Sequence, residues 1–126
     1  MQPFPGPILV VDDDSAVRKA LKFALETEGL EVRLYESPAA LLRDTALPLR
    51  GCLVVDYSMP VMNGIELADV LHGRLVELPV ILIASRVDAE LRRRAQRAGI
   101  AWVLEKPLSD SALLDSIRSA FEVGPH

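Results

Sequence analysis

Residues 8–14 read ILVVDDD, a run of four apolar residues that ends abruptly in three aspartates. A short, continuous apolar run of this kind is typical of a β-strand that is buried on both faces, as in a parallel sheet. From residue 15 to residue 28, apolar side chains recur at helical spacing, and Gly29 marks the stop. Asp14 or Ser15 suits the N-cap of this helix. The opening of the chain therefore predicts a strand followed by a helix.

The same rhythm continues along the rest of the chain. Further strands are expected at residues 32–34, 53–55, 80–84 and 101–104, and further helices at 39–45, 65–71, after Asp88 and after Ser109. Alternation of strands and helices indicates a parallel sheet with right-handed crossovers and helices on both faces. The sequence therefore predicts an α/β, doubly wound fold, in which ligands bind at the carboxyl ends of the strands.

Composition limits the possible classes of protein. The 126 residues, half of them hydrophobic and a quarter charged, suit one domain spanning residues 1–126, with a core over about residues 7–123. A net charge of -4 argues against direct nucleic-acid binding by this domain. Cys52 is the single cysteine, so no intramolecular disulfide can form. No targeting signal or membrane-spanning run is visible, and we expect a soluble, cytoplasmic protein without a membrane partner.

Charged residues follow several of the expected strands. Asp12 and Asp13 come after the first strand, Asp56 ends the third and Lys106 follows the fifth. A doubly wound sheet gathers these ends along one edge. Because neighbouring carboxylates repel one another, a hard divalent cation such as Mg²⁺ (or Mn²⁺) is the natural cofactor for them. Asp56 could act as a nucleophile toward phosphorus, with the metal and Lys106 offsetting charge on the phosphoryl oxygens.

Three motifs then carry a resemblance to a known family. VVDDD at residues 10–14, VVDYSMPVMNG at 54–64 and EKP at 105–107 resemble the receiver domain of two-component response regulators, almost from end to end. The sequences of these motifs and of residues 17–19 are similar to those of FixJ-type receivers. The resemblance implies a flavodoxin-like, five-stranded parallel sheet of strand order 2-1-3-4-5.

The resemblance also implies roles for particular residues. Asp12 and Asp13 would bind Mg²⁺, and Asp56 would be phosphorylated by a sensor histidine kinase or a phosphotransfer protein. Lys106 would contact the phosphoryl group, and the Lys106–Pro107 peptide would be cis. The backbone carbonyl of Ser58, with Asp56, would complete the protein ligands to the metal. Such a domain is a signalling phosphoacceptor and not an enzyme in the usual sense, and it regulates transcription through a separate output domain.

Two positions depart from the family pattern. Ala84 stands where the family has Thr or Ser, with Ser85 next to it, and Val103 stands where the family has an aromatic residue, with Trp102 one place earlier. Because a step of one residue along a strand reverses the side-chain direction, Ser85 is a poor replacement in place. We hypothesise that Asp56 is phosphorylated while the usual switch is absent, weak or rerouted through Ser85 and Trp102.

Surface features leave alternatives open. The region of the fourth helix is basic, which fits either a solvated helix face or a partner surface, such as a homodimer through the fourth helix, fifth strand and fifth helix. The chain suits either a stand-alone receiver or the N-terminal part of a longer regulator.

Three functions are alternatives to a phosphorylated receiver. The first is a degenerate receiver that binds partners without being phosphorylated, as the altered switch suggests. The second is a phosphohydrolase resembling the haloacid dehalogenase class, which usually has an aspartate two residues beyond the nucleophile, where Ser58 stands here. The third is a flavodoxin-like FMN carrier, which is disfavoured because three acidic side chains would repel the phosphate.

Overall fold

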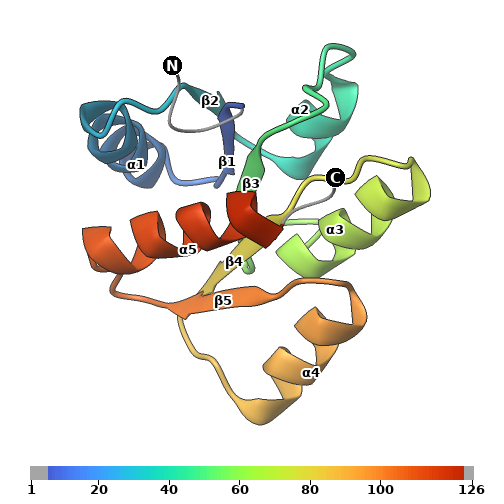
Figure 1. The fold of residues 1–126 in the computed structure, drawn as a ribbon. Coiled ribbons are helices and arrows are strands. Elements are labelled where there is room, and N and C mark those ends of the chain that lie inside the picture. The colour runs from blue at the N-terminus through green and yellow to red at the C-terminus, as the bar shows by residue number, and fades with distance from the viewer. Residues whose placement is uncertain (1–5, 124–126) are drawn as a thin grey trace.

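In the computed structural model, which describes residues 6–123, strands and helices alternate along the chain (Figure 1). The strands are β1 (Ile8–Val11), β2 (Val32–Tyr35), β3 (Cys52–Asp56), β4 (Val80–Ala84) and β5 (Trp102–Glu105). The helices are α1 (Ser15–Thr27), α2 (Pro38–Arg43), α3 (Gly64–Gly73), α4 (Ala89–Arg97) and α5 (Asp110–Val123). The alternation expected from the sequence is confirmed.

All five strands form one parallel sheet in the order β2-β1-β3-β4-β5. The chain first moves outward from β1 to β2, then returns past β1 to β3 and continues in the other direction. The strand order therefore reverses between β1 and β3, and a ligand is expected outside the carboxyl ends of these two strands. The predicted doubly wound fold of order 2-1-3-4-5 is confirmed.

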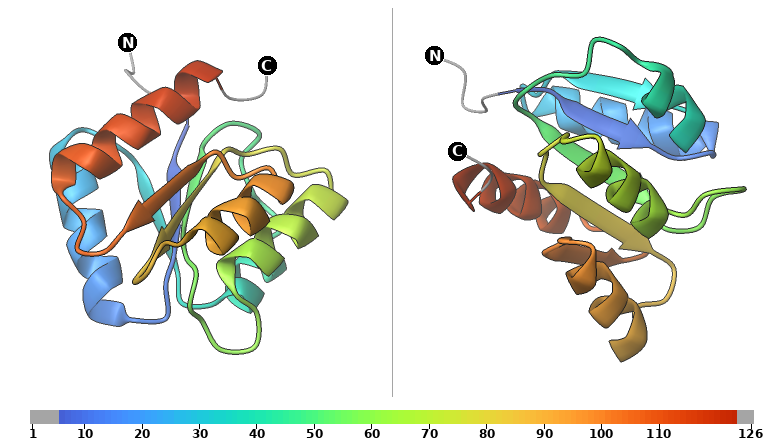
Figure 2. Two further views of the ribbon diagram at one scale, coloured as in Figure 1. Left: turned by 90° about the horizontal axis from the view of Figure 1, so that it is seen from below. Right: turned by 90° about the vertical axis from the view of Figure 1, so that its right-hand side faces the viewer.

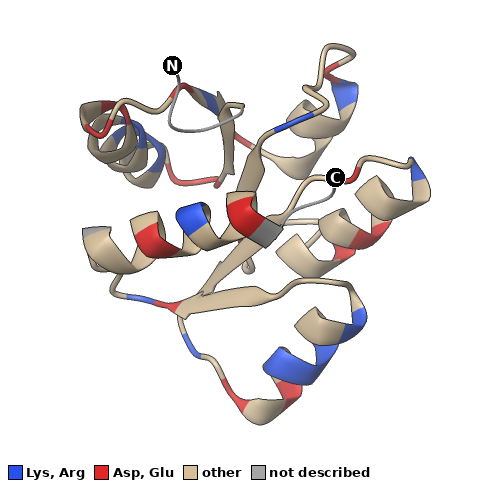
Figure 3. Cartoon of the chain, in the orientation of Figure 1, with Lys and Arg blue, Asp and Glu red and all other residues tan. Residues whose placement is uncertain are grey.

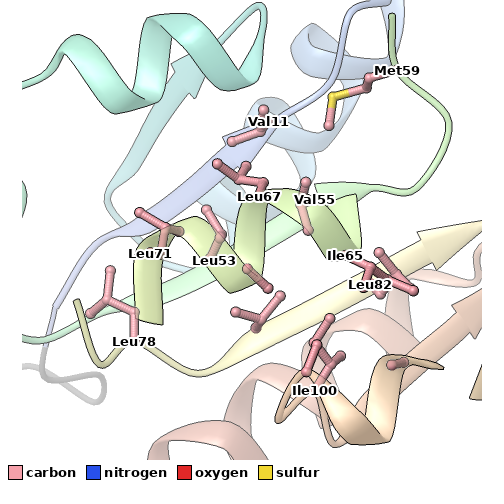
Figure 4. Close-up of a cluster of buried hydrophobic side chains, with 14 of the residues drawn as sticks. Val11, Leu53, Val55, Met59, Ile65, Leu67, Leu71, Leu78, Leu82 and Ile100 are labelled. Atoms are coloured by element: carbon pink, nitrogen blue, oxygen red, sulfur yellow. The ribbon is translucent and has the colours of Figure 1, made fainter. Parts of the chain in front are cut away.

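The two faces of the sheet are covered by different helices (Figure 2). Alternate strand residues such as Ile8 and Val10 pack with α1 and α5, whereas Leu9 and Val11 pack on the side of α2, α3 and α4. The larger cluster, on the side of α3, is drawn in Figure 4. Because both faces of the sheet are covered, the three central strands β1, β3 and β4 are continuous apolar runs up to their carboxyl ends and not alternating ones.

Cys52 belongs to the cluster under α1 and α5 and is fully buried. Burial raises the pKa of its thiol to about 12, so the thiolate, which is the reactive form, is suppressed. Cys52 therefore acts as a small apolar residue. Within residues 6–123, no helix is both long and apolar enough to cross a membrane.

Some element ends differ from the prediction. The second helix ends at Arg43 and not near Thr45, because Asp44 takes an extended backbone conformation and its carboxylate accepts hydrogen bonds from the Tyr35 hydroxyl (2.6 Å) and the Ala46 N–H (2.8 Å). The fifth strand begins and ends one residue later than predicted, since its register with β4 runs to Glu105. Asp14, one of the two expected caps, is the N-cap of α1.

The start of α3 lies directly against the end of β3. Asn63 and Glu66 form a reciprocal capping box, with both hydrogen bonds at 2.9 Å. The next residue after the cap is Gly64, where a Cβ atom would lie only 2.8 Å from the carbonyl oxygen of Asp56 and 2.7 Å from Cδ1 of Leu82. Glycine thus allows the helix to begin beside the strand that ends in Asp56.

Candidate functional site

Three carboxylates meet at the point where the strand order reverses. Asp12 follows β1, Asp13 comes next, and Asp56 is the last residue of β3; one carboxylate oxygen from each lies within 4.8 Å of the others. Asp12 and Asp56 are buried, at 5% and 6% exposure, whereas Asp13 is exposed. The convergence expected from the strand order is confirmed for these three residues.

A lysine approaches the same cluster from β5. The ammonium Nζ of Lys106 lies 3.1 Å from Oδ1 of Asp56. The backbone N–H of Lys106 donates to the carbonyl of Ala84 at 2.9 Å, which extends the pairing of β5 with β4 beyond the strand end. The expected cis peptide between Lys106 and Pro107 is confirmed. Since β5 and β1 lie on opposite sides of β3 in the sheet, the lysine supplies a positive charge from the side of Asp56 that faces away from β1.

Burial changes the proton affinity of the two inner carboxylates. Desolvation raises the pKa of Asp12, and the neighbouring charge of Asp56 raises it further, while the backbone N–H of Asp14 acts in the opposite direction. Desolvation also raises the pKa of Asp56, opposed by the hydrogen bond and the charge of Lys106. One lysine thus does not balance the negative charge of the three carboxylates, and a bound cation would stabilise their charged forms.

The chemistry of the donors fits a hard divalent ion. Magnesium prefers carboxylate oxygens and water, and it is commonly held in proteins by one or two carboxylates. Asp12, Asp13 and Asp56 offer such oxygens, and Asp13 is exposed, so that water can reach a cation bound there. Ser58 lies in the exposed loop after β3. Its carbonyl as a further metal ligand stays a prediction.

The loop that carries the acidic pair is held by two contacts. The N–H of Asp14 donates to Oδ1 of Asp12 at 2.9 Å, and Nη1 of Arg18 donates to the backbone carbonyl of Asp12 at 2.7 Å. Arg18 was not anticipated as part of the site. The available signal was its place one turn into the helix that follows the three aspartates.

The four residues at the altered switch positions lie in different surroundings. Ala84 is buried, at 2% exposure, at the end of β4, and Ser85 beside it is exposed. Val103 packs against the cluster shared with α3 and α4, whereas Trp102 packs on the opposite face of the sheet with α1 and α5. The roles predicted for Ser85 and Trp102 stay predictions.

Two further contacts, one with α4 and one with the loop before it, were also not predicted. The Tyr57 hydroxyl accepts a hydrogen bond from Nη1 of Arg94 at 2.9 Å, and the carboxylate of Glu105 accepts one from the N–H of Val87 at 3.0 Å. The partners are 37 and 18 positions apart in the chain, so no local pattern could have predicted either pair.

The fold and this cluster define a doubly wound α/β domain with an acidic centre and one lysine at the carboxyl edge of its sheet. The family model for the response regulator receiver domain matches residues 8–118. The chain belongs to this family, and it is a receiver of the FixJ type. Receiver domains are signalling domains of two-component systems and not classical enzymes, and their partners are histidine kinases or phosphotransfer proteins.

Similar proteins support this assignment. The transcriptional regulatory protein FixJ of Azorhizobium caulinodans is 42% identical over 115 residues, which are 90% of this chain and 54% of FixJ. The C4-dicarboxylate transport transcriptional regulatory protein DctD of Pseudomonas aeruginosa is 40% identical over 92% of this chain and 25% of its own length. The solved structure of FixJ-N superposes with a TM-score of 0.84 at 32% identity, covering 100% of this chain and 99% of that one. The chain thus spans about half the length of FixJ.

Proposed function

We propose that this receiver accepts a phosphoryl group on Asp56 from a sensor histidine kinase or a phosphotransfer protein, in a reaction that needs Mg²⁺ (or Mn²⁺). The observation that carries the proposal is the position of Asp56, whose carboxylate lies 3.1 Å from Lys106 and beside two further carboxylates. An aspartate between an ammonium and a cation-binding pair is suited to attack an electrophilic phosphorus atom.

The proposed step moves a phosphoryl group from a histidine nitrogen of the donor to Asp56. A carboxylate oxygen of Asp56 forms a bond to phosphorus while the bond from phosphorus to the donor's histidine nitrogen breaks, and that nitrogen leaves with its electron pair. Lys106 stays hydrogen-bonded next to the acceptor carboxylate and offsets the charge of the phosphoryl oxygens. Asp12 and Asp13 would hold the metal, which supplies further positive charge to the same oxygens.

The experiment that tests this proposal is intact-mass spectrometry after incubation with acetyl phosphate and Mg²⁺. We expect a gain of one phosphoryl group that disappears in Asp56→Asn and in the presence of EDTA. Asp69→Asn is the matched control, since it removes an exposed carboxylate from α3, away from the cluster. A gain that persists in Asp56→Asn would contradict the proposed acceptor.

A second candidate is a receiver that binds its partner without phosphorylation. The observation that favours it is Ala84, which is buried at the end of β4 and carries no hydroxyl group for a phosphoryl oxygen. The mass experiment separates the two candidates, because a folded protein that gains no mass in acetyl phosphate and Mg²⁺ supports the second one.

The remaining parts of the proposal concern the protein's surroundings. We propose that residues 1–126 act as one receiver domain within a longer, cytoplasmic transcription regulator, as the names and lengths of FixJ and DctD suggest. We also propose that the face of α4, β5 and α5 forms the homodimer surface. Sedimentation with and without beryllofluoride, a mimic of the phosphoryl group, tests the dimer.

A further inference from the structure

A side-chain hydrogen bond joins the residue after Asp56 to α4. Nη1 of Arg94, on α4, donates to the Tyr57 hydroxyl at 2.9 Å. The guanidinium carbon of the same arginine also lies over the Tyr57 ring, 5.7 Å from its centroid. A hydrogen bond and a cation–π contact on one pair hold the two groups in a defined relative position. The tyrosine follows the proposed acceptor directly in the chain.

The backbone of Tyr57 is tied to the elements around the acceptor. Its N–H donates to the carbonyl of Ile83 on β4 at 2.8 Å, and its carbonyl accepts from the N–H of Gly64, at the start of α3, at 3.1 Å. Asp56 itself is only 6% exposed, so a phosphoryl group attached to it needs space that the side chain alone does not provide. We therefore expect the segment of Asp56 and Tyr57 to adjust when the group is added.

The surroundings of the pair leave room for such an adjustment. A polar hollow of about 210 Å³ lies between the loop and α4, and Tyr57, Arg86, Asp88 and Arg94 are among its lining residues. The alternative positions for coupling to α4 are less suitable. Ala84 has no polar side-chain atom, and Trp102 packs on the opposite face of the sheet from α4. Within residues 6–123, the contact of Tyr57 with Arg94 is thus a direct polar link from the acceptor segment to α4.

We propose that the pair of Tyr57 and Arg94 transmits the state of Asp56 to α4, with Arg94 as a positioning residue that acts through Tyr57. The inference rests on the proposed function, because it takes Asp56 as the acceptor. When the acceptor segment adjusts, the tyrosine ring moves and draws the arginine and its helix with it. The consequence is a change in how α4 presents its basic side chains, which are concentrated on that helix (Figure 3), to an acidic partner surface.

The test compares amide chemical shifts with and without beryllofluoride and Mg²⁺ in the wild type and in variants. We expect beryllofluoride to shift the amides of α4 (Ala89–Arg97) in the wild type, and we expect these shifts to fall by about half or more in Tyr57→Phe and Arg94→Gln. Tyr57→Phe removes only the hydroxyl, and Arg94→Lys keeps a donor and a cation. We expect Arg94→Lys to restore part of the response, which loss of packing alone would not explain.

The matched control is Arg93→Gln. It removes the same charge from the same helix, at an exposed position that makes no side-chain hydrogen bond or ion pair within residues 6–123. The control should keep the full α4 response. If Tyr57→Phe and Arg94→Gln also keep the full α4 response, the proposed coupling through this pair is wrong. The same holds if beryllofluoride shifts only amides near Asp12 and Lys106 in the wild type. Neither result contradicts Asp56 as the acceptor. If beryllofluoride shifts nothing near Asp12 and Lys106 in the wild type, the proposed function fails and the coupling fails with it.

Discussion

Asp12 and Asp56 are buried carboxylates at the ends of neighbouring strands, and each raises the electrostatic cost of the other's charge. Lys106 offsets this cost for Asp56 only in part, since the pKa of Asp56 is still raised. The site therefore carries a cost in stability that a cation or a phosphoryl group with its metal would relieve. Functional sites commonly show such perturbed groups.

Replacing Asp12 by Asn should stabilise the metal-free protein at pH 7. Asn keeps an oxygen acceptor for the Asp14 N–H but removes the buried charge, so we expect the free energy of unfolding to rise by on the order of 1 kcal/mol. The raised pKa means that folded Asp12 holds its proton more tightly than the unfolded chain does. The unfavourable effect therefore builds up as pH rises from the ordinary aspartate pKa of 3.8 to the raised pKa of the folded state, and the gain in the variant should shrink as pH falls through this range.

Urea unfolding in EDTA at pH 7 and at a pH close to the ordinary aspartate pKa of 3.8 measures both effects. Asp69→Asn, an exposed carboxylate on α3, should change little at either pH. A loss of stability in Asp12→Asn at pH 7 would mean that the carboxylate contributes more through its contacts than it costs through its charge.

Replacing Ala84 by Thr should strengthen the binding of beryllofluoride. The site at the end of β4 is buried, so the larger side chain should cost about 1–3 kcal/mol of folding stability. A hydroxyl that donates to a charged oxygen is worth about 1.4 kcal/mol or more, which corresponds to about tenfold in affinity. In beryllofluoride the acceptor is a fluoride that stands in for a phosphoryl oxygen. Titration followed by NMR checks this against Ala84→Val, which has nearly the same shape without the hydroxyl. Equal affinities for the two variants would show that the hydroxyl makes no such contact.

At the scale of elements, the site depends on how closely α3 begins beside β3. Gly64 is the contact point, because any side chain there would collide with the backbone of Asp56. The capping box of Asn63 and Glu66 fixes the first turn of the helix at the same place. The geometry of the acceptor strand and the start of α3 therefore depend on each other.

Gly64→Ala should therefore destabilise the protein by about 1–3 kcal/mol, the usual cost of forcing extra atoms into a packed interior. Gly73→Ala is the matched control, since a Cβ atom there would meet nothing within 4 Å at the other end of the same helix. We expect the control to be neutral or slightly stabilising, because alanine favours helix. Urea denaturation measures both variants. Equal effects would mean that α3 can shift away from β3 without cost.

Most elements could be predicted from the sequence because each carries a local signal. The buried run at residues 8–11, the cap at Asp14 and the stop at Gly29 are examples. The convergence of Asp12, Asp13 and Asp56 could also be predicted, because a doubly wound sheet brings the carboxyl ends of its strands to one edge. The end of α2 was misplaced because it depends on the contact of Asp44 with Tyr35. The pair of Tyr57 and Arg94 is a tertiary contact without a local signal.

At the scale of the whole molecule, charge is distributed unevenly. The chain carries a net charge of -4, yet basic residues gather on α4 (Figure 3). The carboxylates of Asp12, Asp13 and Asp56 gather where β1 and β3 end. A cation is therefore attracted to the acidic edge, and an acidic partner to the basic helix. Binding of a metal at the edge should also stabilise the folded domain, because the unfolded chain does not hold the three carboxylates together.

Magnesium should raise the free energy of unfolding by about 2.7 kcal/mol at a concentration one hundred times its Kd. Asp13→Asn should remove most of this gain, and because Asp13 is exposed the variant should fold normally without metal. Thermal unfolding in MgCl₂ and in KCl of the same ionic strength separates binding from screening. The same stabilisation in both salts would contradict a metal site at this edge.

The most direct measurement locates the phosphoryl group itself. After incubation with acetyl phosphate and Mg²⁺, borohydride reduces an acyl phosphate to an alcohol, so a phosphorylated aspartate becomes homoserine in the peptide map. We predict homoserine at Asp56, and none in the sample that contains EDTA. Homoserine at Asp12, Asp13 or another carboxylate, or none at any position in a folded protein, would contradict the account.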